Sequence, residues 1–164
     1  MSSHKEYLSD PRRDSRRELA QGLIADLNGR GSVITYSSFE NKILNQLGTL
    51  FPDLAKDLDA IGQRIIDLEA IIRDNYYHPG FHGRTSVKAT LPALVDMSYK
   101  GLKIGDGDSA SATFAYMAMG RYDDEQIEHL KEDLRTYCGQ DTLAMVKLHE
   151  RLYEQVEKSE YVSI

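Results

Sequence analysis

An apolar repeat near the C-terminus constrains the fold more than any other feature. Its members recur every three or four residues, the spacing of one buried helical face. They are Ile127, Leu130, Leu134, Tyr137, Ala144, Met145, Leu148 and Leu152. Asp141 falls on the same face, although burying a carboxylate is costly unless it has a hydrogen-bond partner or a metal. The alternative is a break at Gly139, with Asp141 as the N-cap of a second helix.

The rest of the chain is predicted to be α/β and predominantly helical. We expect helices at 16–28 (capped by Ser15), 39–50, two stretches within 51–77 broken near Gly62, 87–95, 109–119 and 123–157. The segment "SVITY", 32–36, is the one convincing strand, because it is β-branched and aromatic and is bounded by Gly31 and Ser37. Proline and glycine predict a loop at 78–86.

Composition narrows the class of protein. The 164 residues, 41% of them hydrophobic, suit one globular domain. No run approaches the roughly 18 apolar residues of a membrane span, and the N-terminus has no signal-peptide core. We therefore expect a cytoplasmic protein with no membrane partner. The single Cys138 excludes an internal disulfide, and the net charge of −6 argues against binding nucleic acid by charge alone.

Two segments contain candidate catalytic residues. Tyr137 and Asp141 are four residues apart, so on a helix their side chains lie one turn apart on one face. Glu40 lies in the first turn of a helix that directly follows the strand, where ligands collect in open α/β folds. The alternative for Glu40 is structural, because Ser37-x-x-Glu40 matches a capping box in which the glutamate only returns a hydrogen bond.

The loop at 78–86 and the start of the next helix supply candidate substrate contacts. Arg84, Ser86 and Lys88 could contact a phosphate backbone there, because helix N-termini bind anions. Ordinary capping by Ser86 with a solvated Lys88 is the alternative. His78 belongs to the same substrate-binding group. It is not expected to form a zinc pair with His82, because Pro79 and Gly80 prevent a helix between them.

Three segments resemble the DnaQ-like exonuclease superfamily, whose fold is ribonuclease H-like. They are "SSFENKILNQLGTLFPDL", "YYHPGFHGRTSVKATLPAL" and "YCGQDTLAMVKL". The first and last are similar to the second and third motifs of that superfamily, and all three resemble most closely an uncharacterised bacterial domain within it. The resemblance covers about residues 16 to 153.

The resemblance implies a metal-dependent 3′–5′ exonuclease. In that superfamily four acids hold two Mg²⁺ or Mn²⁺ ions, the arrangement of two-metal phosphoryl chemistry. Glu40 and Asp141 would be two of these metal ligands, and Tyr137 would orient the attacking water. Glu40 replaces the more usual aspartate of its motif. The carboxylates of Glu40 and Asp141 are expected to lie within about 4–8 Å of each other.

The first motif of the superfamily, Asp-x-Glu on an early strand, is absent from this sequence. We therefore expect only the C-terminal part of a ribonuclease H-like fold, without its first strands, and an incomplete metal site. Residues 1–14 would be a tail or the end of a strand, 15–157 the exonuclease-like part, and 158–164 a C-terminal tail.

Two functions remain open at the level of sequence. The chain is either part of an exonuclease-like domain that is inactive alone, or a non-catalytic interaction or structural module that retains the helical part of the fold. Expected partners are a nucleic-acid 3′ end, and an upstream fragment or a second copy of the chain.

Overall fold

The computed structural model describes the backbone of residues 4–160 and the side chains of residues 4–157. This part of the chain contains seven α-helices, one 3₁₀ turn and two strands. In order they are α1 (Arg16–Leu27), β1 (Val33–Thr35), α2 (Phe39–Leu50), α3 (Ala55–Gly62), β2 (Ile65–Asp67), α4 (Leu68–Asn75), η1 (Pro79–Phe81), α5 (Val87–Val95), α6 (Gly107–Ala118) and α7 (Asp124–Glu160). The predicted class, α/β and predominantly helical, is confirmed.

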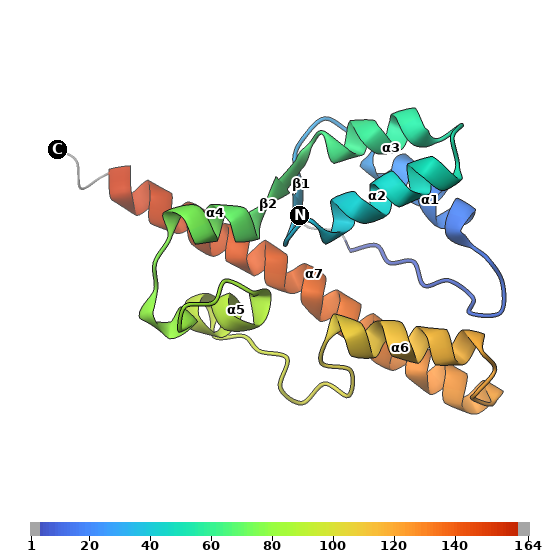
Figure 1. Cartoon of the computed structure of the whole chain (residues 1–164). Coiled ribbons are helices and arrows are strands. Elements are labelled where there is room, and N and C mark those ends of the chain that lie inside the picture. The colour runs from blue at the N-terminus through green and yellow to red at the C-terminus, as the bar shows by residue number, and fades with distance from the viewer. Residues whose placement is uncertain (1–3, 161–164) are drawn as a thin grey trace.

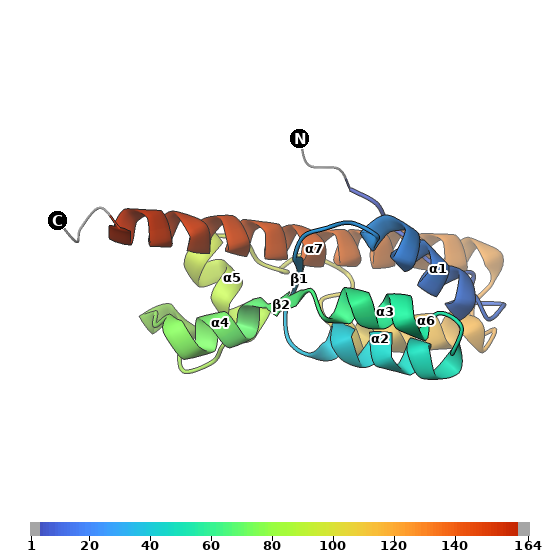
Figure 2. The same ribbon diagram turned by 90° about the horizontal axis from the view of Figure 1, so that it is seen from above.

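Helix α7 is the longest helix of the described structure. It runs from one end to the other, with α6 beside its N-terminal half and α4 and α5 beside its C-terminal half (Figure 1). Helices α1, α2 and α3 form a separate group next to its middle, on the side where the two strands lie (Figures 1 and 2). No helix within residues 4–160 has both the length and the apolar character needed to cross a membrane.

Three apolar clusters hold these elements together. The first joins α1, α2 and α3 through Ala20, Leu44, Leu47, Leu58 and Ile61. The second joins α6 to the first half of α7 through Ile104, Met117, Ile127, Leu134 and Tyr137. The third joins α4 and α5 to the second half of α7 through Leu68, Leu91, Ala144 and Leu148. The predicted apolar stripe of α7 is therefore divided between two clusters.

The two strands form a parallel pair, with Val33 opposite Ile65 and Thr35 opposite Asp67. The chain passes from β1 to β2 through α2 and α3, so both strands end at the same edge of the sheet. Strand β2 was not predicted, because its apolar run is equally typical of a continuing helix. Pairing with β1 decides the conformation of these residues, since strand preference depends strongly on context.

Several local predictions are wrong. Helix α7 continues through Gly139, so Asp141 is not an N-cap. Helix α7 runs beyond the predicted helix end at 157. Residues 4–14 contain no strand, which leaves the tail as the description of this segment. Ser15 and Ser86 occupy N-cap positions, but neither side chain makes a capping hydrogen bond. The rest of the predicted tails, 1–3 and 161–164, lies outside the described residues.

Candidate functional site

The site lies where β1 and β2 end, and Asp67 organises its backbone. As the last residue of β2, Asp67 accepts hydrogen bonds through Oδ1 from the backbone N–H of Ser37 at 2.8 Å and of Glu69 at 2.9 Å. The second of these bonds caps α4, and the first holds the turn after β1, where Ser37 has a φ of 86°. One carboxylate therefore ties the ends of both strands together.

Glu40 does not form the capping box that its spacing allowed. In a capping box, Glu40 would accept a hydrogen bond from the backbone N–H of Ser37. That N–H donates instead to Asp67. Oε2 of Glu40 is buried and has no hydrogen-bond partner among the described residues. The structural alternative for Glu40 is therefore wrong, and the side chain holds a buried carboxylate oxygen with no donor.

The pKa of Glu40 reflects its burial and the charges of two other acids. Burial raises the pKa of Glu40 above its usual value, and the negative charges of Asp141 and Asp67 raise this pKa further. Like charges have this effect only when they lie near one another. The charge of Asp141 on α7 therefore acts on Glu40 on α2, and the predicted separation of about 4–8 Å stays a prediction.

Asp141 has a hydrogen-bond partner that was not predicted from the sequence. The hydroxyl of Tyr99, in the loop between α5 and α6, donates to Oδ1 of Asp141 at 2.5 Å. No periodic pattern marks a tyrosine in an irregular loop, so the sequence carried no signal for this contact. Asp67 was also missed, although an Asp directly after an apolar run is a common helix N-cap.

Tyr137 lies beside the same carboxylate, as its spacing predicted. Its ring centroid is 6.1 Å from that of Tyr99. Burial raises the pKa of Tyr137 to about 12, and the negative charge of Asp141 contributes to this increase. The phenol is therefore protonated at neutral pH, so it can donate a hydrogen bond to a water but cannot act as a base.

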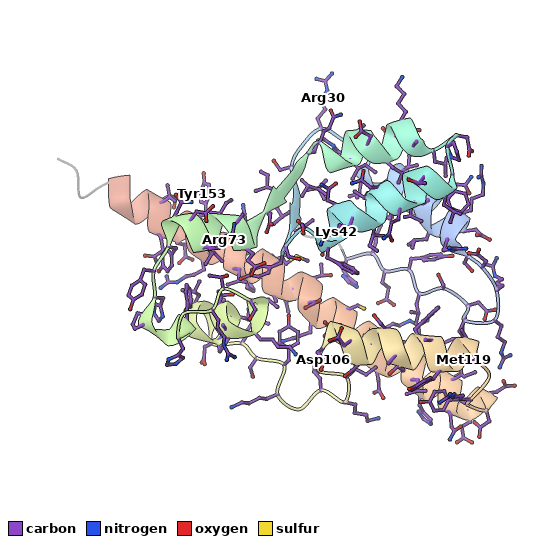
Figure 3. The ribbon with its side chains drawn as sticks, viewed as in Figure 1. Arg30, Lys42, Arg73, Asp106, Met119 and Tyr153 are labelled. Carbon is purple, nitrogen blue, oxygen red and sulfur yellow. The ribbon has the colours of Figure 1, made fainter. Side chains whose placement is uncertain are left out.

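The candidate substrate contacts separate into two groups. Arg84, Ser86 and Lys88 are exposed near the start of α5, and Lys88 lines a 530 Å³ cavity together with Tyr99 and Lys100. This cavity brings Lys88 close to the partner of Asp141. Lys88 forms only a long ion pair of 4.0 Å with Asp106, at the start of α6 (Figure 3).

His78 belongs to neither the acidic site nor the cavity. Its Nδ1 accepts the backbone N–H of Gly80 at 3.1 Å, and its ring lies 5.5 Å from that of Phe81. These contacts cap the 3₁₀ turn η1. The structure therefore gives His78 a local structural role and does not bring it to the other candidate residues.

The carboxylate oxygens of the site suit a hard cation, but they are few. Within the described residues, no group of three or more His, Cys, Asp or Glu side chains is arranged to hold a metal ion. Glu40 and Asp141 together offer carboxylate oxygens, which Mg²⁺ and Mn²⁺ prefer. The buried oxygen of Glu40, with no donor and with negative charge nearby, fits a position that a cation would stabilise.

Comparisons with known proteins identify the family. No curated protein and no solved structure matches the chain. A family described as a domain of unknown function, DUF2779, matches residues 1–86, more than half of the 164 residues. The matched part includes Glu40, Asp67 and both strands, and ends before Tyr99 and Asp141. The chain belongs to the DUF2779 family.

Proposed function

We propose that the chain contributes the second and third acidic motifs of a metal-dependent 3′–5′ exonuclease-like domain that hydrolyses nucleic-acid ends. One observation supports this proposal above the others. The buried, unpartnered oxygen of Glu40 lies within the electrostatic influence of Asp141, at the carboxyl ends of two parallel strands. This edge of an open α/β sheet is where ligands usually bind.

Each residue has a defined part in this proposal. Glu40 and Asp141 would hold Mg²⁺ or Mn²⁺, which when bound supplies an activated water and stabilises the leaving oxygen. Tyr137, protonated at neutral pH, would donate a hydrogen bond that orients the water. Lys88 would contact the phosphate backbone from the neighbouring cavity. The other two acids would come from a segment carrying Asp-x-Glu, upstream or in another chain.

A second function, a non-catalytic interaction module, is favoured by the lack of three clustered metal ligands in the part of the chain that the structure describes. In that case the helices of this protein would support a partner, and the acids would be relics of an ancestral site. The two functions differ in whether the chain binds a divalent cation.

Metal titration separates them. Under the exonuclease proposal, isothermal titration with Mn²⁺ should show weak binding to the unmodified protein. Glu40→Gln and Asp141→Asn should each weaken this binding about tenfold, because each removes a ligand charge. Glu132→Gln, which changes an exposed acid on α7, should leave it unchanged. Equal binding by all four proteins would contradict the proposed site.

Nuclease activity gives a separate readout. With two of the four acids, the chain alone should show no processive, Mg²⁺-dependent degradation of single-stranded DNA or RNA from the 3′ end. Robust digestion that Asp141→Asn abolishes would show that this chain already contains every essential ligand, contrary to our proposal.

A further inference from the structure

We propose that Tyr99 is a positioning residue, which fixes the orientation of the Asp141 carboxylate at the candidate site. The hydrogen bond from Tyr99 to Asp141 lies within the chain and does not depend on the proposed function. Only its purpose, presenting Asp141 to a cation, rests on the proposed function. Nothing in the spacing of the chain suggests this role, because Tyr99 lies in a loop distant in sequence from Asp141.

Asp141 lies at a junction where packing alone does not hold it. One turn before it, Tyr137 belongs to the cluster between α6 and α7, and further along α7, Ala144 belongs to the cluster with α4 and α5. Asp141 itself is only partly buried. Hydrogen bonds therefore contribute to the orientation of its carboxylate.

Tyr99 is placed to supply such a hydrogen bond. Among residues 4–157, it is the one tyrosine that packs against both of these clusters, so its ring spans the junction at which Asp141 lies. Its hydroxyl donates to Oδ1 of Asp141 at 2.5 Å. Since a tyrosine phenol is a neutral donor at physiological pH, this bond occupies one oxygen and sets the direction of the other.

The loop that carries Tyr99 is itself fixed to α7. The side-chain amide of Gln140 donates to the backbone oxygen of Ser98 at 3.4 Å. Asp96 and Gly101 on either side adopt left-handed conformations, with φ of 53° and 92°, so the backbone turns sharply around Tyr99. Two neighbouring residues of α7 therefore contact this loop. Gln140 donates to its backbone, and Asp141 accepts a hydrogen bond from the Tyr99 hydroxyl.

This arrangement matches the way in which outer residues orient metal ligands. A ligating side chain is commonly held by a hydrogen bond from a second residue, and removing that residue typically weakens metal binding 10- to 100-fold. The competing explanation is that Tyr99 merely fastens the loop to α7. Gln140→Ala provides a matched control, because it removes the other fastening contact without touching the carboxylate of Asp141.

The decisive experiment measures the side-chain rotamer of Asp141 in metal-free protein, from NMR three-bond couplings. We expect one dominant rotamer in the unmodified protein and in Gln140→Ala, and averaging over rotamers in Tyr99→Phe, which removes only the hydroxyl. Tyr36→Phe, which removes a partly buried hydroxyl bonded to Thr90 at 2.7 Å, should leave the couplings unchanged. An unchanged rotamer in Tyr99→Phe would overturn the inference.

Mn²⁺ titration then tests the purpose of the contact. Tyr99→Phe should weaken binding at least tenfold, whereas Gln140→Ala and Tyr36→Phe should change it less than about twofold. In an Asp141→Asn background, Tyr99→Phe should have no further effect, because Tyr99 acts through Asp141. If the unmodified protein binds no Mn²⁺, the proposed function fails, and the rotamer measurement still decides whether Tyr99 positions Asp141.

Discussion

At the scale of single residues, the two candidate ligands differ in how the protein accommodates them. Asp141 has a hydrogen bond from Tyr99, which offsets part of the cost of placing a carboxylate on an apolar helix face. Glu40 has a buried oxygen without a described partner and lies near two other acids. The free-energy cost of burying carboxylates at the site therefore comes mainly from Glu40.

This difference predicts a pH-dependent gain in stability for Glu40→Gln. The folded protein raises the pKa of Glu40 above its usual 4.5, so the folded state binds this proton more tightly than the unfolded chain. Its contribution to the free energy of unfolding is therefore most favourable below pH 4.5, and is lost as pH rises through the folded pKa. At pH 7 we expect Glu40→Gln to raise the free energy of unfolding by at most about 1 kcal/mol, because solvent screens the charge of a side chain that is only partly buried.

Urea unfolding between pH 4 and pH 7 measures this effect. The advantage of Glu40→Gln should grow with pH across this range and should be absent from Glu132→Gln, the exposed control on α7. A gain that is the same at both ends of the range would contradict the electrostatic explanation.

At the scale of elements, Asp67 holds the end of the sheet together. Its Oδ1 receives backbone N–H groups from the turn after β1 and from the first turn of α4. The positive φ of Ser37 shows that the turn adopts a conformation unusual for a residue with a side chain. The bond to Asp67 fixes that turn, and with it the start of the helix that carries Glu40.

We therefore expect Asp67→Ala to destabilise the protein by about 2–3 kcal/mol. Loss of the cap accounts for about 1 kcal/mol, and the unsatisfied N–H of Ser37 accounts for the remainder. Asp106→Ala is the matched control, because Asp106 caps α6 through Ser109 but, within residues 4–160, receives no backbone N–H from another element. It should cost only about 1 kcal/mol. Equal losses for both variants in chemical denaturation would show that the contact with Ser37 contributes nothing.

At the scale of the whole molecule, the fold is a long helix with three clusters and a small sheet. Two-stranded sheets are marginally stable alone, and unpaired strand edges template pairing with other chains. Several large apolar side chains are also exposed. On β2 and α7 they are Ile66 at 38%, Leu143 at 44%, Val146 at 42%, Tyr153 at 61% and Val156 at 59%. Tyr153 lies on the C-terminal part of α7 (Figure 3).

These features predict that the isolated chain associates, either with a second copy or with a segment that extends the sheet. Sedimentation at tens of micromolar should show species larger than a monomer. Ile66→Lys should reduce this association, because it places a charge on β2. Tyr77→Lys, at a loop residue that is 88% exposed, should not. A monomer with a cooperative thermal transition would contradict the prediction.

The sequence determined the helices and the first strand, because both depend on local spacing. The bounds of α2 and α5 agree with the predicted ranges, and Asp141 lies on the buried face that its position in the repeat indicated. These features need only the periodicity of apolar residues and the choice of turn residues, which a single segment contains.

The contacts between these elements depend on how the chain packs in three dimensions. Strand β2 forms because it pairs with β1. The backbone N–H of Ser37, which a capping box would direct to Glu40, donates instead to Asp67, which follows α2 and α3 in the chain. Tyr99 reaches Asp141 from a loop with no periodic signal. Each of these contacts joins residues distant in sequence, and a local pattern carries no information about which distant residue will satisfy a buried polar group.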